Sequence, residues 1–186
     1  MGHFNYARHF GVLAAATVVL FLLGHWDLLS DSLLASFAIN GALHASSLSL
    51  APLSPQSILR KLAFIAGAAA LSMFTMYVGI IGLVLFAAVP GNERLYLALG
   101  LCSLTGAITY GSLIRLFWIR KFPPRRILGL AFLCLLATSL AFFVRVYFEG
   151  LGGWWLAAVW WFAFSGGLWF FDTHPDALRP SKYNGA

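Results

Sequence analysis

The chain has 186 residues, of which 61% are hydrophobic and only 10% charged, and its mean hydropathy is +0.85. Water-soluble domains carry about 25% charged residues, so this composition excludes an ordinary soluble domain and predicts a chain that folds in lipid. The formal net charge of +6 comes from basic residues beside apolar runs, which favours contact with anionic lipid headgroups and not with nucleic acid.

Apolar runs separated by polar turns predict six membrane-spanning helices joined by short loops, in a single all-α domain. No small-x-small cleavage site follows the first run, so we expect an uncleaved span and not a signal peptide. Pro90-Gly91 marks a turn after the third run, and Pro123-Pro124 marks another after the fourth. The expected spans cover residues 10–26, 33–53, 62–89, 95–117, 127–148 and 154–171.

The basic residues predict how the helices are threaded, because Lys and Arg resist translocation and stay on the cytoplasmic side. With the N-terminus inside, ten of the twelve basic residues lie inside, and only Arg94 and Arg145 lie outside. We therefore expect both termini in the cytoplasm, in a multi-pass protein of a bacterial cytoplasmic (inner) membrane. The second run is the least apolar, and a re-entrant second segment would place the N-terminus outside instead.

The basic residues of the inner side form a candidate site for a lipid phosphate or another anionic ligand. Arg115 lies inside the fourth run and is long enough to extend its charge to the headgroups. The alternative is that these residues only anchor the helix ends. The group consists of Arg60, Lys61, Arg115, Arg120, Lys121, Arg125 and Arg126.

A polar face on the second run is the candidate ligand-binding site. Asn40 and His44 are four residues apart and share one helical face, which Ser47 continues. Thr105 and Thr109 share a face of the fourth run, and His44 and Thr105 fall at a similar depth near the membrane midplane. The two faces either line one polar pocket or join helices by hydrogen bonds. Because ionisable groups at that depth are costly, we expect the His44 imidazole to face the bundle interior.

The sixth run carries five of the seven tryptophans. Trp154, Trp155 and Trp169 lie at its ends and match the aromatic belts of membrane interfaces. Trp160 and Trp161 lie deeper and either pack against other helices or stack on a flat apolar ligand, such as a quinone, an isoprenoid or an acyl chain.

No catalytic motif is present, and the interiors of the expected spans contain no Asp or Glu, which favours a protein that is not an enzyme. A haem held by two histidines is also disfavoured. His9 and His25 are 16 residues apart, which places them about 24 Å apart at opposite ends of the first helix. His44 has no second histidine at its expected level. The sequence therefore identifies no metal and no particular cofactor.

Two functions fit these features. The first is a non-enzymatic membrane-embedded partner or assembly subunit, associated with another membrane protein or with further copies of itself. The alternative is a small-molecule or lipid binding or transport protein, either a substrate-binding membrane subunit or a small carrier, with a polar pocket around His44 and Thr105. A membrane redox protein that uses haem or quinone ranks third.

Overall fold

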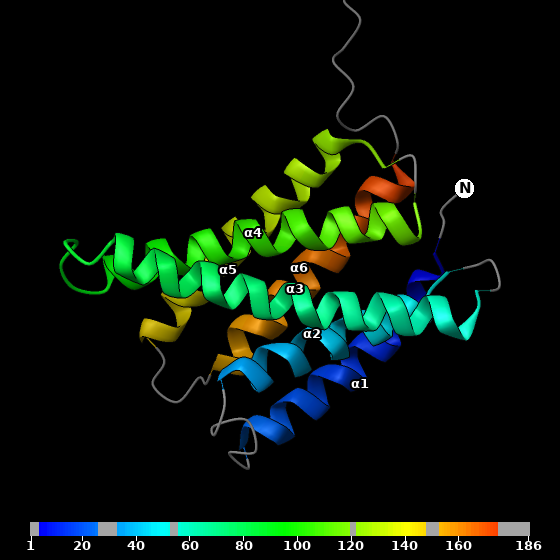
Figure 1. Cartoon of the computed structure of the whole chain (residues 1–186), viewed down its shortest axis with the longest axis horizontal. Helices are drawn as coiled ribbons and strands as arrows, with labels where there is room; N and C mark the ends of the chain where they lie inside the picture. The colour runs from blue at the N-terminus through cyan, green and yellow to red at the C-terminus, as the bar shows by residue number, and fades with distance from the viewer. Residues whose placement is uncertain (1–3, 26–32, 53–55, 120–121, 148–152, 175–186) are drawn as a thin grey trace, which may run out of the picture.

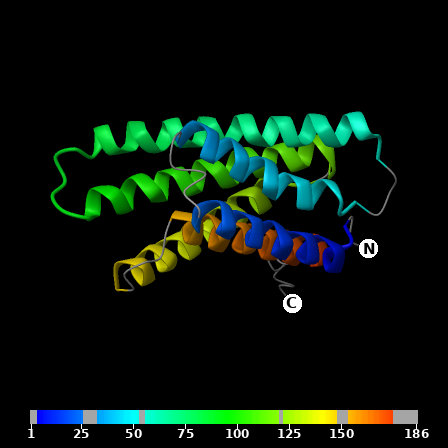
Figure 2. The same cartoon turned by 90° about the horizontal axis from the view of Figure 1, so that it is seen from below.

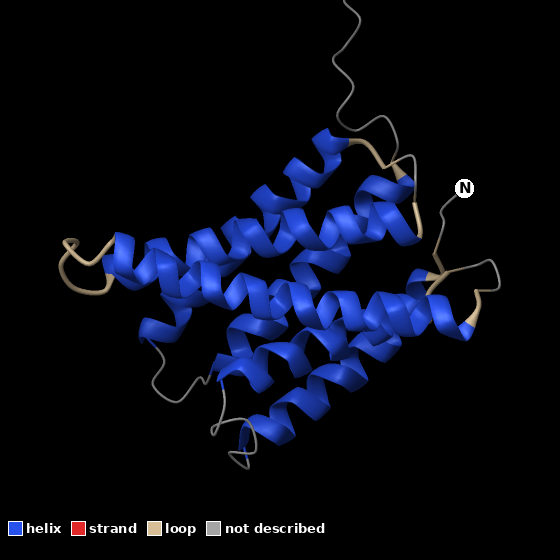
Figure 3. Ribbon diagram, viewed as in Figure 1, coloured by secondary structure: helices blue, strands red, loops and turns tan. Residues whose placement is uncertain are grey.

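The computed structural model describes residues 4–25, 33–52, 56–119, 122–147 and 153–174 (Figure 1). Within these ranges the regular structure is six helices, and an isolated β-bridge pairs Phe4 with Pro52. The helices are α1 (Tyr6–His25), α2 (Leu33–Ser49), α3 (Ile58–Leu85), α4 (Glu93–Phe117), α5 (Pro124–Tyr147) and α6 (Gly153–Thr173). The predicted all-helical fold is confirmed (Figure 3).

Five of these helices, α1 and α3 to α6, are long and apolar enough to cross a membrane. This is the pattern of a multi-pass membrane protein, as the composition predicts. The exception is α2, which has 17 residues and is therefore about 26 Å long at 1.5 Å per residue.

Each helix packs against the next one along the chain, and α1 also packs against α6, so the six helices form a closed ring. Figure 2 shows α3 and α1 on opposite sides of the bundle. Successive helices run in opposite directions because the connections between them are short.

Local chemistry shifts some helix ends from the expected bounds. α3 begins four residues early, at Ile58, because the Ser57 side chain accepts a hydrogen bond from the Arg60 amide at 3.3 Å and caps the helix. It ends at Leu85, ahead of a turn in which Gly91 has a φ of 66°. Pro124 begins α5, since the first helical residue needs no amide hydrogen.

Three hydrogen bonds define one end of the bundle, which we call the basic end. The Asn5 amide donates to the Ala51 carbonyl at 2.7 Å and joins the start of α1 to the end of α2. Arg60 donates to the Phe117 carbonyl, and Arg126 donates to the Phe171 carbonyl at 2.9 Å. The basic end therefore holds the starts of α1, α3 and α5 and the ends of α2, α4 and α6 (Figure 1).

The main hydrophobic core occupies the half of the bundle toward the basic end, where Phe64, Phe122 and Phe164 are almost fully buried. A smaller cluster of Leu13, Ala16, Leu20 and Trp161 lies between α1 and α6. The exposed side chains are mostly large and apolar, particularly along α3 and α5, as lipid-facing surfaces require.

Close packing of α2 against α3 generates the first testable prediction. A Cβ at Gly41 would lie 2.7 Å from the Ala68 carbonyl oxygen and would also clash with the Ser72 side chain. We expect Gly41→Ala to lower the free energy of unfolding by about 1–3 kcal/mol, as overpacking does. Gly166→Ala is the matched control, because a Cβ there meets nothing within 4 Å and helix propensity favours alanine by about 1 kcal/mol.

The comparison is made by equilibrium unfolding of the two variants in the same detergent or lipid. Equal stabilities for the two variants would show that α2 and α3 do not approach each other this closely.

Candidate functional site: a buried histidine and a lateral groove

His44 lies inside the bundle and is only 1% exposed. Its Nε2 shares a hydrogen bond of 3.2 Å with the Ser165 hydroxyl of α6. The sequence-based prediction that this imidazole faces the interior and finds a partner on another helix is confirmed. Its ligand-binding role stays a prediction.

Four aromatic rings surround the His44 imidazole, and we call them the aromatic box: Tyr110, Trp160, Trp161 and Phe164. Tyr110 of α4 stacks on one side at a centroid distance of 5.0 Å and an interplanar angle of 26°. Trp161 of α6 stacks at 5.7 Å and 6°. Trp160 and Phe164 present their rings nearly perpendicular to the imidazole, each at 5.7 Å.

The aromatic box joins three helices at one point. The Tyr110 hydroxyl donates to the Gly41 carbonyl at 3.0 Å, so α4 is bonded to α2 beside the stacked rings. Aromatic pairs of this geometry contribute about 0.5–1.5 kcal/mol each beyond the area they bury. The sequence suggested that Trp161 could stack on a flat ligand. In the structure this side chain is only 3% exposed, and its ring stacks on His44.

His9 is a buried residue that sequence reasoning missed. It lies in the first turn of α1, near the end of the helix as expected, but it is fully buried and packs against the rings of Tyr6 and Phe10. The reason is that α1 starts at Tyr6 and turns His9 inward. The detectable signal is the buried stripe His9, Leu13, Ala16 and Leu20, at offsets of four, seven and eleven residues.

Asp172 is a second residue that sequence reasoning missed, because the last expected span ends one residue before it, at residue 171. α6 continues to Thr173, and Asp172 is 8% exposed. The Tyr6 hydroxyl donates to its Oδ2 at 3.0 Å, which ties the start of α1 to the end of α6. Ser165 and Asp172 are seven residues apart on α6 and therefore share one face.

The polar face predicted on α4 does not meet His44 in the contacts that the structure describes. The Thr109 hydroxyl donates to the Thr105 carbonyl of its own helix at 2.8 Å. Cys102, which lies three residues before Thr105 on α4, donates to the Thr75 carbonyl of α3 at 3.2 Å. The α4 residue beside His44 is Tyr110, which hydropathy could not single out from other aromatics.

On α2 the remaining predicted site residues also bond to their own helix. The Asn40 amide donates to the Ser36 carbonyl at 2.9 Å, and the Ser47 hydroxyl donates to the His44 carbonyl at 2.7 Å. Short polar side chains often bond to the preceding turn in this way. The structure therefore brings together His44, Trp160 and Trp161 and leaves the threonines of α4 outside the group.

Two of the predicted anion-binding residues form hydrogen bonds to backbone carbonyls within the protein. Arg60 donates to the Phe117 carbonyl at the end of α4 and lies over the Trp118 ring at 5.3 Å. Arg126 bonds to the Phe171 carbonyl, and both bonds satisfy helix C-termini, where positive charge is favourable. Of the others, Arg115 and Arg125 are exposed and Lys61 is half-buried, while Arg120 and Lys121 lie outside the described residues.

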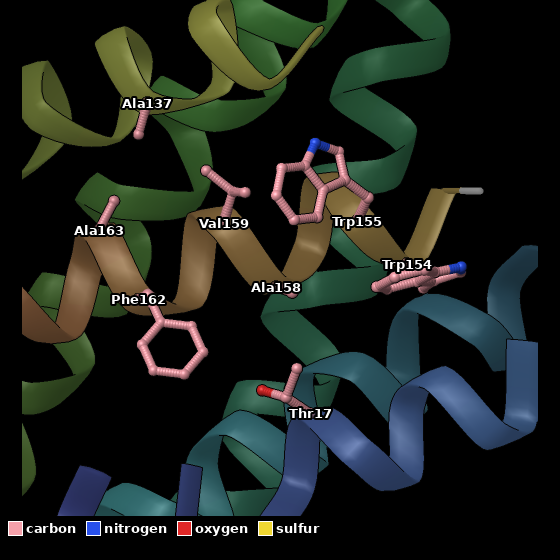
Figure 4. A pocket seen from close by; sticks show the side chains of 8 residues that line it. All are labelled: Thr17, Ala137, Trp154, Trp155, Ala158, Val159, Phe162 and Ala163. Atoms are coloured by element: carbon pink, nitrogen blue, oxygen red, sulfur yellow. The ribbon is translucent and has the colours of Figure 1, made fainter. Parts of the chain in front are cut away.

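A groove of about 470 Å³ opens on the side of the bundle, where α6 runs between α1 and α5 (Figure 4). Thr17 of α1 and Ala137 of α5 form its sides, and the Thr17 hydroxyl bonds to its own helix. The lining from α6 is Trp154, Trp155, Ala158, Val159, Phe162 and Ala163. Sequence analysis did not predict this groove, because it depends on how α1 and α5 diverge on either side of α6.

Comparisons with known proteins identify no relative. No protein-family model matches the chain, and neither a curated protein nor a solved structure shows significant similarity to it.

Proposed function

We propose that the six helices each cross the membrane, with the basic end and both termini in the cytoplasm. The basic residues of the described helices support this orientation: Arg8, Arg60, Lys61, Arg115, Arg125 and Arg126 belong to the basic end, and Arg94 and Arg145 to the other. Such an asymmetry orients membrane proteins because basic segments resist translocation. The short α2 is packed between α1 and α3, which reduces its exposure to lipid.

This orientation predicts that a single cysteine introduced at Asn92, in the turn before α4, reacts with a membrane-impermeant reagent added outside the cell. The control is a cysteine at Ser57, which precedes α3 at the basic end and should react only after the membrane is opened. The opposite pattern of labelling would reverse the orientation.

We further propose that the protein binds a lipid or another apolar chain molecule laterally, and the groove over α6 is the observation that carries this function. Its volume of about 470 Å³ falls within the ~300–1,000 Å³ of small-molecule sites. The groove lies on helices suited to a membrane, so lipid chains are the molecules it meets there.

The lining of the groove is almost entirely apolar. The Thr17 hydroxyl is bonded to its own helix, and Val159 and Phe162 give a lipid chain an apolar surface to lie along. Trp155 is the third residue of α6, at the level of a membrane interface in the proposed orientation, where tryptophan rings are favoured beside lipid headgroups.

A membrane segment of a partner protein is the second candidate, as in the partner-subunit hypothesis. The observation in its favour is that Ala137, Ala158 and Ala163 line the groove, since small residues allow close approach of another helix. A whole helix is about 10–12 Å wide, so it would insert only side chains into the groove.

Filling the groove tests the lipid-binding function. We expect Ala163→Leu to displace a bound chain, so that purified protein retains several-fold less lipid by mass spectrometry than the wild type. Ala70→Leu is the matched control, because Ala70 is an exposed alanine of α3 outside the groove. Equal lipid retention by the two variants would contradict lipid binding at this site.

A photoreactive residue at Val159 separates the two candidates. Cross-linking to lipid supports the proposed function, whereas a discrete adduct with a protein supports the partner-subunit alternative.

A further inference from the structure

Two arginines at the basic end, Arg115 in the last turn of α4 and Arg125 in the first turn of α5, hold no other part of the described structure. Both side chains are exposed, and neither guanidinium bonds to another described residue. Arg60 and Arg126 at the same end differ, because each donates a hydrogen bond to the carbonyl of a neighbouring helix. The charges of Arg115 and Arg125 are therefore available to a molecule outside the protein.

The packing of α4 against α5 places these two arginines at nearly the same level of the bundle. A Cβ at Gly111 would lie 3.1 Å from Cγ2 of Ile127, so these residues mark a point where the two antiparallel helices touch. Arg115 is four residues after Gly111, about 6 Å closer to the basic end, at 1.5 Å per residue. Arg125 is two residues before Ile127, about 3 Å in the same direction. The two charges therefore lie side by side on neighbouring helices.

No carboxylate among the described residues is placed to neutralise this pair of arginines. Glu93 lies at the opposite end of α4, and Asp172 is buried and accepts a hydrogen bond from Tyr6. Two adjacent positive charges repel each other, and an anion between them removes that cost. Guanidinium groups bind phosphate oxygens through paired, charge-assisted hydrogen bonds. A phosphate is therefore the anion that this pair suits best.

An exposed apolar stripe runs along α5 from Arg125 toward the middle of the bundle. Leu128, Phe132 and Leu136 follow Arg125 at offsets of three, seven and eleven residues, so the four residues share one face of the helix. The three apolar side chains are 62%, 59% and 51% exposed. A cationic end that continues into a long apolar face matches the headgroup and the chain of a phospholipid, whereas a free phosphate ion would use only the arginines.

We propose that Arg115 and Arg125 bind the phosphate of an anionic phospholipid, whose acyl chain lies along the exposed face of α5. Basic groups between helix ends hold such headgroups at the cytoplasmic surface of membrane proteins. A zwitterionic lipid carries a positive group beside its phosphate, which the two arginines repel, so the site prefers a headgroup with net negative charge. None of these residues lines the groove over α6, so this site does not depend on the lipid-binding function proposed for the groove.

Native mass spectrometry of the full-length protein in mild detergent tests the proposal. The protein is titrated with phosphatidylglycerol or with phosphatidylcholine of identical acyl chains, and the bound lipids are counted. We expect the wild type to bind phosphatidylglycerol more tightly. The double variant Arg115→Gln with Arg125→Gln should bind phosphatidylglycerol about tenfold more weakly, with little change for phosphatidylcholine.

Arg94→Gln with Arg145→Gln is the matched control, because it removes two exposed arginines from the opposite ends of the same two helices. It changes the net charge equally and should retain the preference for phosphatidylglycerol. Ala163→Leu in the groove should retain it as well, which separates the two lipid sites. Equal losses in the two arginine double variants would reduce the effect to general charge attraction and overturn the proposal. Displacement of the lipid by excess inorganic phosphate would also overturn it, because the site would then bind the free ion.

Discussion

The His44 imidazole joins its own helix, α2, to both α4 and α6, and the arrangement of the bundle depends on that contact. α2 is the shortest helix and falls outside the set that is long and apolar enough to span a membrane, so hydropathy alone does not hold it in place. In lipid there is no hydrophobic force between apolar helices, and packing with a few polar contacts determines which surfaces meet. Stacking on Tyr110 and Trp161 and the hydrogen bond to Ser165 supply such contacts and fix the depth of α2.

α6 has a different environment on each of its sides. Trp161, Phe164 and Ser165 face the imidazole, whereas Val159, Phe162 and Ala163 line the groove. The inner side is filled by the protein's own rings, so a ligand for this protein is better sought on the lateral side. This division favours lipid binding at the surface over the enclosed polar pocket that the spacing of His44 and Thr105 suggested.

Hydropathy and turn residues were enough to predict the all-helical fold, because a span of apolar residues in lipid has no stable alternative to a helix. The inward orientation of His44 was also predictable, since an imidazole avoids lipid. The neighbours of His44, in contrast, were not predictable from the sequence. Tyr110 resembles any other aromatic residue of an apolar run, and the burial of His9 and Asp172 depends on helix ends that lie a few residues from the expected bounds. Three-dimensional packing alone specifies those neighbours.

The central claim is that His44 and Ser165 act on each other across the bundle, and a double-mutant cycle measures this most directly. The free energy of unfolding in lipid is determined for the wild type, His44→Ala, Ser165→Ala and the double variant. The structure predicts a coupling energy of about 0.5–1.5 kcal/mol, as for a buried hydrogen bond. A parallel cycle of His44 with the exposed Thr173 should give additive effects, since distant sites usually do. Additivity between His44 and Ser165 themselves would contradict the account.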